Sequence, residues 1–176
     1  MIKFLIVGEN SINKVPLVDL LLQNKGKFKI ASIFTTNQED SNKKYYYYID
    51  NMTLNMCHKN NAIVYVKTVV SDSYGVTIDE FEDSNVIFMN TEDFNNISNK
   101  VFLTSDELVI IWLDTKNHDD RVKNEMRESE YLIEKINQDK LKYLYFLDTP
   151  IIEIMDVICE YLENESSRKE LLEKYE

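Results

Sequence analysis

The segment that decides the expected fold is IVGENSINKVPLVDLLL, residues 6–22. The apolar run over residues 2–7 predicts a buried strand, which ends at Gly8. Five residues separate Gly8 from Lys14, and the leucine spacing that follows predicts a helix over residues 15–24. A strand, a short loop that opens with glycine and a helix, in this order, are typical of an α/β protein.

The loop that runs from Gly8 to Lys14 is similar to a phosphate-binding loop, G-x-x-x-x-G-K-[ST]. In such a loop, backbone N–H groups surround phosphate oxygens, the lysine adds a charge and the hydroxyl binds magnesium. Asn13 replaces the second glycine and can adopt a left-handed conformation. Val15 cannot bind magnesium, and Pro16 removes one N–H from a helical turn that tolerates proline. The segment is therefore either a degenerate phosphate loop or an ordinary strand–helix turn with a solvated lysine.

Composition predicts one folded domain. The 176 residues are 44% hydrophobic, and the net charge of −11 argues against DNA or RNA as a ligand, because phosphate contacts need clustered Lys and Arg. No apolar run approaches the roughly 18 residues of a membrane span, and no signal-peptide pattern opens the chain. We therefore expect a cytoplasmic protein without a membrane partner. Cys57 and Cys159 each lack a second nearby thiol, which argues against a disulfide framework.

Strand-like and helix-like segments alternate along the rest of the chain, which predicts an α/β fold with a mostly parallel central sheet. Further strands are expected over residues 28–34, 45–49, 62–70, 85–89, 107–113 and 142–147, and helices over 52–59, 78–83, 118–141 and from about 150. A turn is expected at SDSYG, residues 71–75, and Trp112 is expected in the core. Ligands of parallel sheets bind beyond the carboxyl ends of the strands, where the loop over residues 8–14 is expected.

Three further motifs follow this loop in a familiar order: Thr35-Thr36, the tyrosines at 45–48, and Tyr74-Gly75. With the loop, they resemble the guanylate kinases, a family of P-loop nucleoside monophosphate kinases that carries T-T-R, a tyrosine-bearing GMP-binding lobe and Y-G-[ST]. The resemblance implies one P-loop kinase-like domain over residues 1–176 with a three-layer α/β fold. It also implies a small mixed β lobe at about 35–80, which accepts the nucleotide, and a lid-like helical segment at about 116–141.

The resemblance also implies which residues form the site. The catalytic residues are expected to be Lys14, Arg121 and Arg127, although both arginines have surface pairing with neighbouring acidic residues as an alternative. The residues expected to bind a nucleotide are Gly8, Asn13, Lys14, Tyr47, Tyr74 and Gly75. For the tyrosines at 45–48, packing of a half-buried strand is the alternative. No metal ligand is assigned, and ATP and magnesium are expected only if the protein is a kinase.

Departures from the family pattern fall on functional positions. Asn37 stands where T-T-R has its phosphate-binding arginine, and Tyr65 stands where the family reads guanine with an acidic residue. Val76 replaces the hydroxyl after Tyr-Gly, and Met89 and Asn90 replace the aspartates of the catalytic strand. Phosphoryl transfer depends on positioning and on neutralisation of charge. These losses therefore predict a fold that has dropped its chemistry.

Three functions follow from this pattern as hypotheses. The first is a non-catalytic guanylate kinase-like protein that acts as an acidic binding module for another protein. Its cleft would be plugged by side chains such as Tyr65, Val76 or Met89. The alternative is a divergent (deoxy)nucleoside monophosphate kinase that transfers phosphate from ATP. The third is a sensor that binds one nucleotide without transfer.

Overall fold

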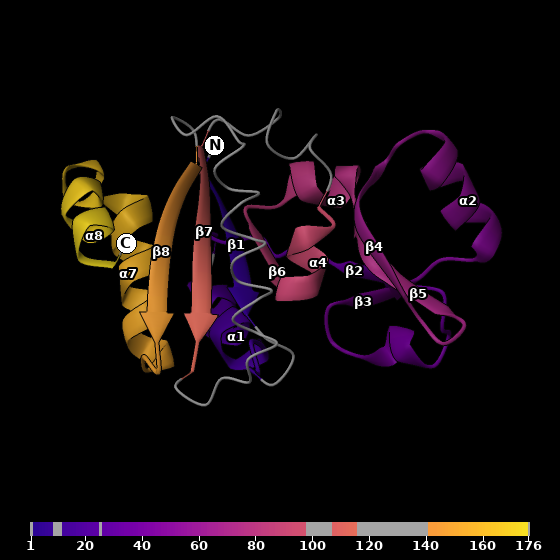
Figure 1. Cartoon of the computed structure of the whole chain (residues 1–176), viewed down its shortest axis with the longest axis horizontal. Helices are drawn as coiled ribbons and strands as arrows, with labels where there is room; N and C mark the ends of the chain where they lie inside the picture. The colour runs from indigo at the N-terminus through magenta and orange to yellow at the C-terminus, as the bar shows by residue number, and fades with distance from the viewer. Residues whose placement is uncertain (1, 9–11, 25, 98–106, 116–140, 176) are drawn as a thin grey trace.

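The computed structural model describes residues 2–8, 12–24, 26–97, 107–115 and 141–175 (Figure 1). The strands are β1 (Ile2–Gly8), β2 (Ile33–Thr35), β3 (Tyr46–Tyr48), β4 (Ile63–Val69), β5 (Asp72–Thr77), β6 (Val86–Asn90), β7 (Glu107–Asp114) and β8 (Leu141–Leu147). The α-helices are α1 (Val15–Gln23), α2 (Asn51–Lys59), α3 (Ile78–Asp83), α4 (Thr91–Asn95), α7 (Ile151–Glu163) and α8 (Arg168–Tyr175). The 3-10 helices in the described residues are η1 (Asp40–Asn42) and η2 (Glu165–Ser167).

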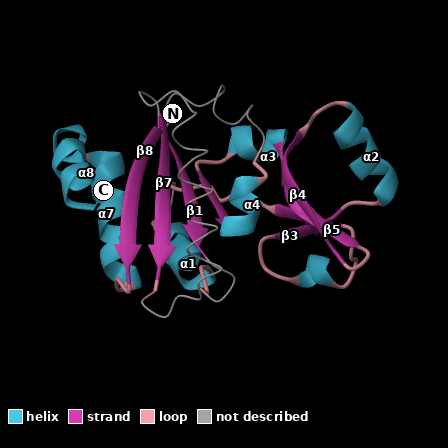
Figure 2. Cartoon of the chain, viewed as in Figure 1, coloured by secondary structure: helices cyan, strands magenta, loops and turns pink. Residues whose placement is uncertain are grey.

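The larger sheet has the strand order β6-β1-β7-β8, and all of its strands are parallel (Figure 2). Residues 3–8 of β1 are all buried, as expected for a parallel strand that is covered on both faces. Gly8 lies opposite Asn90 of β6 and Leu113 of β7, so these strands end at the same edge. The loop after β1 therefore starts beside the carboxyl ends of β6 and β7.

Different elements cover the two faces of the larger sheet, because alternate strand residues point to opposite sides. On one face, residues such as Phe4 and Val109 pack with residues of α1, α7 and α8. On the other face, Leu5 and Trp112 pack with residues of α3, α4 and the smaller sheet. The Trp112 ring meets Phe94 of α4 edge to face, with centroids 6.2 Å apart. The α/β fold is thus confirmed, and Trp112 lies in the core as predicted.

The smaller sheet has the order β3-β2-β5-β4 and is mixed. β2 runs parallel to β3 and antiparallel to β5, which in turn pairs antiparallel with β4. α2 lies at the outer end of this part of the molecule (Figure 1). We call residues 33–77 the small lobe. The predicted small mixed β lobe is present, and its role as a nucleotide acceptor stays a prediction.

The strand predicted over residues 28–34 is wrong in its bounds, because only Ile33–Thr35 form a strand. The preceding residues run along the outer edge of β6 before the chain crosses to the small lobe. Ile30 forms an isolated parallel bridge with Val86, and the Ala31 N–H donates to the Val86 carbonyl oxygen at 2.9 Å. Residues 28–34 thus contact β6 of the larger sheet first and enter the smaller sheet afterwards. In the sequence, these two short apolar stretches look like one strand.

The turn predicted at residues 71–75 is also wrong, because most of it belongs to β5. The hairpin turn lies at Val70 and Ser71, where Val70 has a φ of 60°. Gly75 suggests a turn, yet a Cβ at this position would lie 2.2 Å from the carbonyl oxygen of Tyr65. Glycine here permits the close approach of β5 to β4 and to Phe34.

The helix predicted over 118–141 and the lid-like segment at 116–141 lie outside the described residues, except that Leu141 opens β8. The final helix is confirmed as α7, with Pro150 immediately before it. Cys57 and Cys159 are both free thiols. Among the described residues, no helix has the length and apolar character to span a membrane.

Candidate functional site

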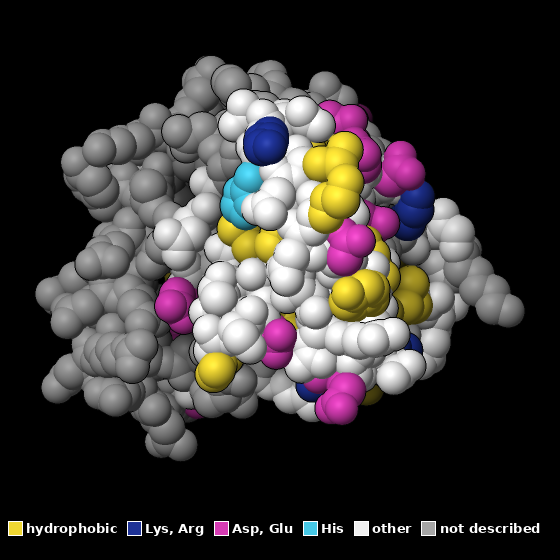
Figure 3. Space-filling model, turned by 90° about the vertical axis from the view of Figure 1, so that its right-hand side faces the viewer, with side chains coloured by type: hydrophobic (Ala, Val, Ile, Leu, Met, Phe, Trp, Pro, Cys, Tyr) yellow, Lys and Arg dark blue, Asp and Glu magenta, His cyan; other side chains and the backbone are white. Residues whose placement is uncertain are grey.

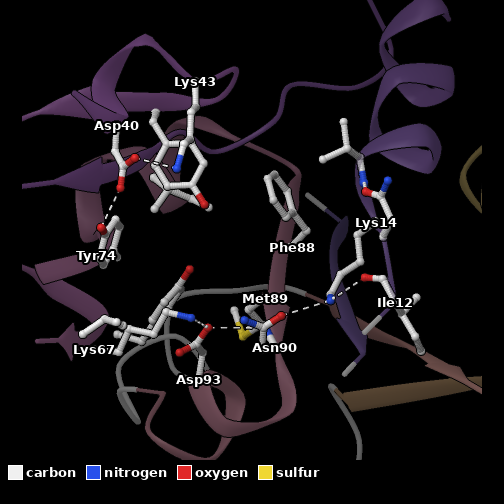
Figure 4. Close-up of a pocket in the computed structure, with 16 residues that line it drawn as sticks. Ile12, Lys14, Asp40, Lys43, Lys67, Tyr74, Phe88, Met89, Asn90 and Asp93 are labelled. Carbon is white, nitrogen blue, oxygen red and sulfur yellow. Dashed lines mark hydrogen bonds and ion pairs between the residues drawn. The ribbon is translucent and has the colours of Figure 1, made fainter. Parts of the chain in front are cut away.

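A cavity of about 510 Å³ lies between the carboxyl-end edge of the larger sheet and the small lobe (Figure 4). Its walls come from the loop after β1 (residues 12–15), from residues 88–90 and 93 at the end of β6, and from the small lobe. Its charged lining residues are Lys14, Asp40, Lys43, Lys67 and Asp93. Tyr65 and Met89 line the cavity without filling it, whereas Val76 is fully buried and is not among the lining residues.

Lys14 forms the loop end of the cavity. Its side chain is only 6% exposed and folds back over the strand ends. The Nζ atom donates to Asn90 Oδ1 at 3.1 Å and to the Ile12 carbonyl oxygen at 3.2 Å. Because Asn90 is the last residue of β6, this contact fixes the lysine above the edge where the parallel strands end. A buried ammonium at this place suits an anionic ligand.

The other predicted loop residues have structural contacts. Asn13 lines the cavity, and its Oδ1 accepts from the Val15 N–H at 3.2 Å, which satisfies one N–H at the start of α1. Gly8 does not line the cavity. A Cβ on Gly8 would lie 3.1 Å from the Leu113 carbonyl oxygen, so this glycine lets β1 pack closely against β7. Whether Gly8 and Asn13 bind a nucleotide stays a prediction.

Asp40 joins two groups at the small-lobe end of the cavity. Its Oδ1 accepts from Lys43 Nζ at 2.5 Å, and its Oδ2 accepts from the Tyr74 hydroxyl at 2.6 Å (Figure 4). The hydrogen bonds from Lys43 and Tyr74 hold the pKa of Asp40 below its usual value. The hydrogen bond to Asp40 raises the pKa of Tyr74, so the Tyr74 hydroxyl keeps its proton and donates it to Asp40. The Tyr74 ring also meets Tyr46 edge to face, with centroids 6.4 Å apart.

Lys67 and Asp93 form a second pair at this end. Lys67 Nζ lies 3.1 Å from Asp93 Oδ2, which also accepts from the Asn90 N–H at 3.4 Å as part of the capping box of α4. Asp93 is 3% exposed. Its Oδ1 is buried and accepts no hydrogen bond from any residue that the structure describes. Nearly all buried polar atoms in native proteins have a partner, so this oxygen requires an explanation.

The tyrosines of the small lobe differ in whether they line the cavity. Tyr46, Tyr65 and Tyr74 line the cavity, whereas Tyr47 does not, because neighbours on a strand point to opposite faces. Burial, and to a lesser degree the charge of Asp93, raises the pKa of Tyr65 well above its usual value, so this residue also stays protonated. Gly75 lies inside the small sheet and does not line the cavity. Arg121 and Arg127 are outside the described residues.

Sequence reasoning missed most of the charged residues at the small-lobe end. Lys43 and Lys67 lie on different segments, and their carboxylate partners Asp40 and Asp93 are three and 26 residues away. The alternation of β4 indicates only that Lys67 shares a face with Tyr65, which also lines the cavity. No short motif marks these pairs, because the fold brings their segments together.

The small lobe also exposes apolar side chains on its outer face. Met52 and Met56 of α2 are 73% and 54% exposed, and Val70 at the β4–β5 turn is 99% exposed. Figure 3 shows hydrophobic and acidic side chains interspersed on this side of the molecule. The predicted protein partner and acidic recognition surface stay predictions.

Comparison with known proteins supports the fold. No protein-family model and no curated protein matches the sequence. Among solved structures, the chain is similar to the guanylate kinase from Anaplasma phagocytophilum, with a TM-score of 0.57 and 16% sequence identity. The match covers 98% of this chain and 93% of that chain. The fold is therefore guanylate kinase-like, as the order of the motifs predicted.

Proposed function

We propose that this protein binds a single nucleotide in the cavity between the larger sheet and the small lobe, and that it does not transfer a phosphoryl group. The carrying observation is the open cavity of about 510 Å³ with the buried ammonium of Lys14 at one end. Ligand-binding cavities typically measure about 300–1,000 Å³, so the space suits one mononucleotide. Lys14 then contacts the phosphate, and the small lobe surrounds the nucleoside.

The residues around the loop favour binding over transfer. Phosphoryl transfer requires magnesium and positive groups on the transferring and accepting phosphates. The Val15 side chain offers no oxygen to magnesium, whereas a phosphate loop has a hydroxyl at this position. The loop therefore lacks one of the groups that hold magnesium during transfer.

The small-lobe end favours the same conclusion. Lys43 is paired with Asp40 and Lys67 with Asp93, so the four groups together carry no net charge. An acceptor phosphate placed there would lie beside two carboxylates. An uncharged group therefore suits the small-lobe end, and we assign the phosphate to the buried ammonium of Lys14 at the other end. The expected role of Arg121 and Arg127 as lid arginines stays a prediction.

The thermal midpoint of the protein with ATP, ADP, GMP and deoxynucleoside monophosphates, each with magnesium, tests the proposal. A nucleotide at 100 times its dissociation constant stabilises the folded state by about 2.7 kcal/mol, which corresponds to about 5–11 °C. Lys14→Ala should abolish the shift. Lys44→Ala is the matched control, because Lys44 is exposed and pairs with Asp19 of α1, and neither residue lines the cavity.

A phosphotransfer assay with ATP and each monophosphate accompanies the thermal midpoints, and together they separate the three hypotheses. A shift that depends on Lys14, without phosphate transfer from ATP to any monophosphate, supports the proposal. Lys14-dependent transfer favours the divergent kinase instead. No shift with any nucleotide at millimolar concentration contradicts a nucleotide site and leaves the binding module for another protein.

A further inference from the structure

Tyr45, the residue just before β3, has an unusual backbone conformation. Its φ is 69°, which lies in the left-handed region that residues with a Cβ rarely adopt. Its carbonyl oxygen accepts from the Ile33 N–H of β2 at 2.7 Å, which ties this conformation to the small sheet. Such strain persists where the surrounding contacts hold a residue in place, and it often marks a functional position. The side-chain contacts of Tyr45 give a reason for the strain.

The Tyr45 side chain reaches out of the small lobe. Its hydroxyl donates to Asp19 Oδ1 of α1, and its ring meets Phe88 of β6 edge to face, with centroids 5.7 Å apart. The hydrogen bonds from Lys44 and Tyr45 hold the pKa of Asp19 below its usual value, so the acceptor is an ionised carboxylate. A hydrogen bond to a charged group is stronger than one between neutral groups. Tyr45 thus links the small lobe to α1 and to β6.

Both partners of Tyr45 are tied to the loop end of the cavity. α1, which carries Asp19, begins directly after Lys14. The Val18 N–H donates to the Lys14 carbonyl oxygen at 3.1 Å, so Lys14 is joined to the first turn of this helix. Phe88 lines the cavity itself (Figure 4). The Tyr45 side chain is therefore held by the same elements that position Lys14.

The residues on either side of Tyr45 belong to the small-lobe end. Lys43 and Tyr46 both line the cavity, and the Tyr46 N–H donates to the Lys43 carbonyl oxygen at 3.1 Å in the turn that carries Tyr45. The contacts of Tyr45 therefore fix how far these two residues lie from Lys14. A site whose parts are held in place before the ligand arrives loses less free energy to ordering when the ligand binds.

We infer that Tyr45 is a positioning residue that holds the small lobe against α1 before any ligand binds. It thereby sets the affinity for ligands that span the cavity, but not for small anions that contact only Lys14. Without the hydroxyl, the small lobe is displaced in part of the population, and the apparent affinity falls in proportion to the fraction that remains in place. This inference rests on the proposed nucleotide binding and goes beyond it by naming the residue that keeps the two ends of the cavity at a fixed separation.

Calorimetric titration with two probes tests the inference. The first is the nucleotide of the panel above that gives the largest thermal shift, and the second is inorganic pyrophosphate, which has no nucleoside to reach the small lobe. In Tyr45→Phe, which removes only the hydroxyl, nucleotide binding should weaken about three- to tenfold, the value of one hydrogen bond. Pyrophosphate binding should change by less than about twofold. A role in stability alone would leave the ratio of the two affinities unchanged.

Two variants serve as matched controls. Tyr48→Phe removes the hydroxyl of a tyrosine that is 47% exposed and does not line the cavity, so both affinities should stay unchanged. Lys44→Ala removes the exposed ion pair with Asp19 and leaves the Tyr45 hydroxyl in place. Because exposed ion pairs contribute little, this variant should also bind both probes as the wild type does.

Asp19→Ala tests the same contact from the side of α1. It removes the acceptor of the Tyr45 hydroxyl and should reproduce the effect of Tyr45→Phe. The double variant should bind the nucleotide no more weakly than the weaker single variant, because both changes remove one bond. If the thermal midpoint shows that Tyr45→Phe does not fold, Asp19→Ala replaces it.

The outcomes separate this inference from the proposed function. Unchanged nucleotide affinity in Tyr45→Phe, or in Asp19→Ala where it takes its place, overturns the inference alone, as does equal weakening of both probes. If the wild type binds the nucleotide but not pyrophosphate, the assignment of the phosphate to Lys14 is wrong and the inference fails with it. A wild type that binds neither probe overturns the proposed function and the inference together.

Discussion

The two ends of the cavity differ in how deeply their lysines are buried. At the loop end, Lys14 is 6% exposed and donates to an amide oxygen and a backbone carbonyl oxygen at the edge of the larger sheet, whereas the Lys43 and Lys67 side chains are 65% and 31% exposed. At the small-lobe end, Lys43 and Lys67 each contact a carboxylate that lines the same space. The loop end is built on the ends of buried parallel strands, and the small-lobe end on a short mixed sheet.

This difference assigns different parts of one ligand to the two ends. A phosphate gains most beside a buried ammonium such as that of Lys14, whereas two lysine–aspartate pairs suit an uncharged polar ring. Under the proposed function, one nucleotide spans the cavity from the Lys14 end to the small-lobe end. The following variants change one end and leave the other intact.

The largest effect is expected for Gly75→Ala. The new Cβ would lie 2.2 Å from the Tyr65 carbonyl oxygen and 2.7 Å from the Phe34 ring, so β4 and β5 must separate. We expect a loss of about 3 kcal/mol in the free energy of unfolding, measured by urea denaturation. Nucleotide binding should weaken, while pyrophosphate binding at Lys14 should persist if the larger sheet stays folded.

Gly26→Ala is the control for this substitution. Gly26 has a φ of 89°, but among the described residues no atom beyond its chain neighbours lies within 4 Å of an added Cβ. Its cost should therefore be backbone strain alone, about 1–2 kcal/mol, with both ends of the cavity unchanged. Equal losses in the free energy of unfolding for the two alanine variants would contradict the packing role of Gly75.

The next largest effect is expected on pyrophosphate affinity when the lysines of the two ends are replaced. Lys14→Met should weaken pyrophosphate binding about 10- to 150-fold, the value of a hydrogen bond to a charged group. Lys43→Met should weaken it by less than about fivefold, because Lys43 is engaged with Asp40. Calorimetry with pyrophosphate measures both. A larger loss for Lys43→Met would reverse the assignment of the two ends.

The smallest effect is expected in the pH dependence of stability, through Asp40 at the small-lobe end. Hydrogen bonds from Lys43 and Tyr74 lower the pKa of Asp40 from 3.8, so folding favours the ionised form. The resulting stability is complete above the unfolded pKa and is lost as the pH falls through the lower folded pKa. The difference in thermal midpoint between wild type and Asp40→Asn should therefore narrow from about pH 6 to about pH 2. A difference that widens on acidification would contradict the lowered pKa.

The larger sheet was predictable because each strand has a local signature. β1 and β7 are continuous apolar runs with buried residues on both faces, and such runs occur in covered parallel strands. The small sheet was less predictable. Its strands are short, and Gly75 is required by the neighbouring backbone and not by a turn. The sequence around Gly75 does not indicate which backbone segment will lie against it.

The candidate site also has a part that was predictable from the sequence and a part that was not. The spacing of Gly8 and Lys14 placed the lysine at the strand ends, where the structure has it. The Lys67–Asp93 pair could not be predicted, because it depends on β4 lying beside α4. The open cavity also corrects the expectation of a plugged cleft, because Tyr65 lies against its wall and Val76 points into the core.

Competition between ADP and pyrophosphate, followed by calorimetry on the wild-type protein, tests the central claim most directly. If one nucleotide spans the cavity with its phosphate at Lys14, the protein binds one ADP per chain, and saturating pyrophosphate displaces it. Simultaneous binding of ADP and pyrophosphate, or two ADP molecules per chain, would contradict the account and favour the separate donor and acceptor sites of a kinase.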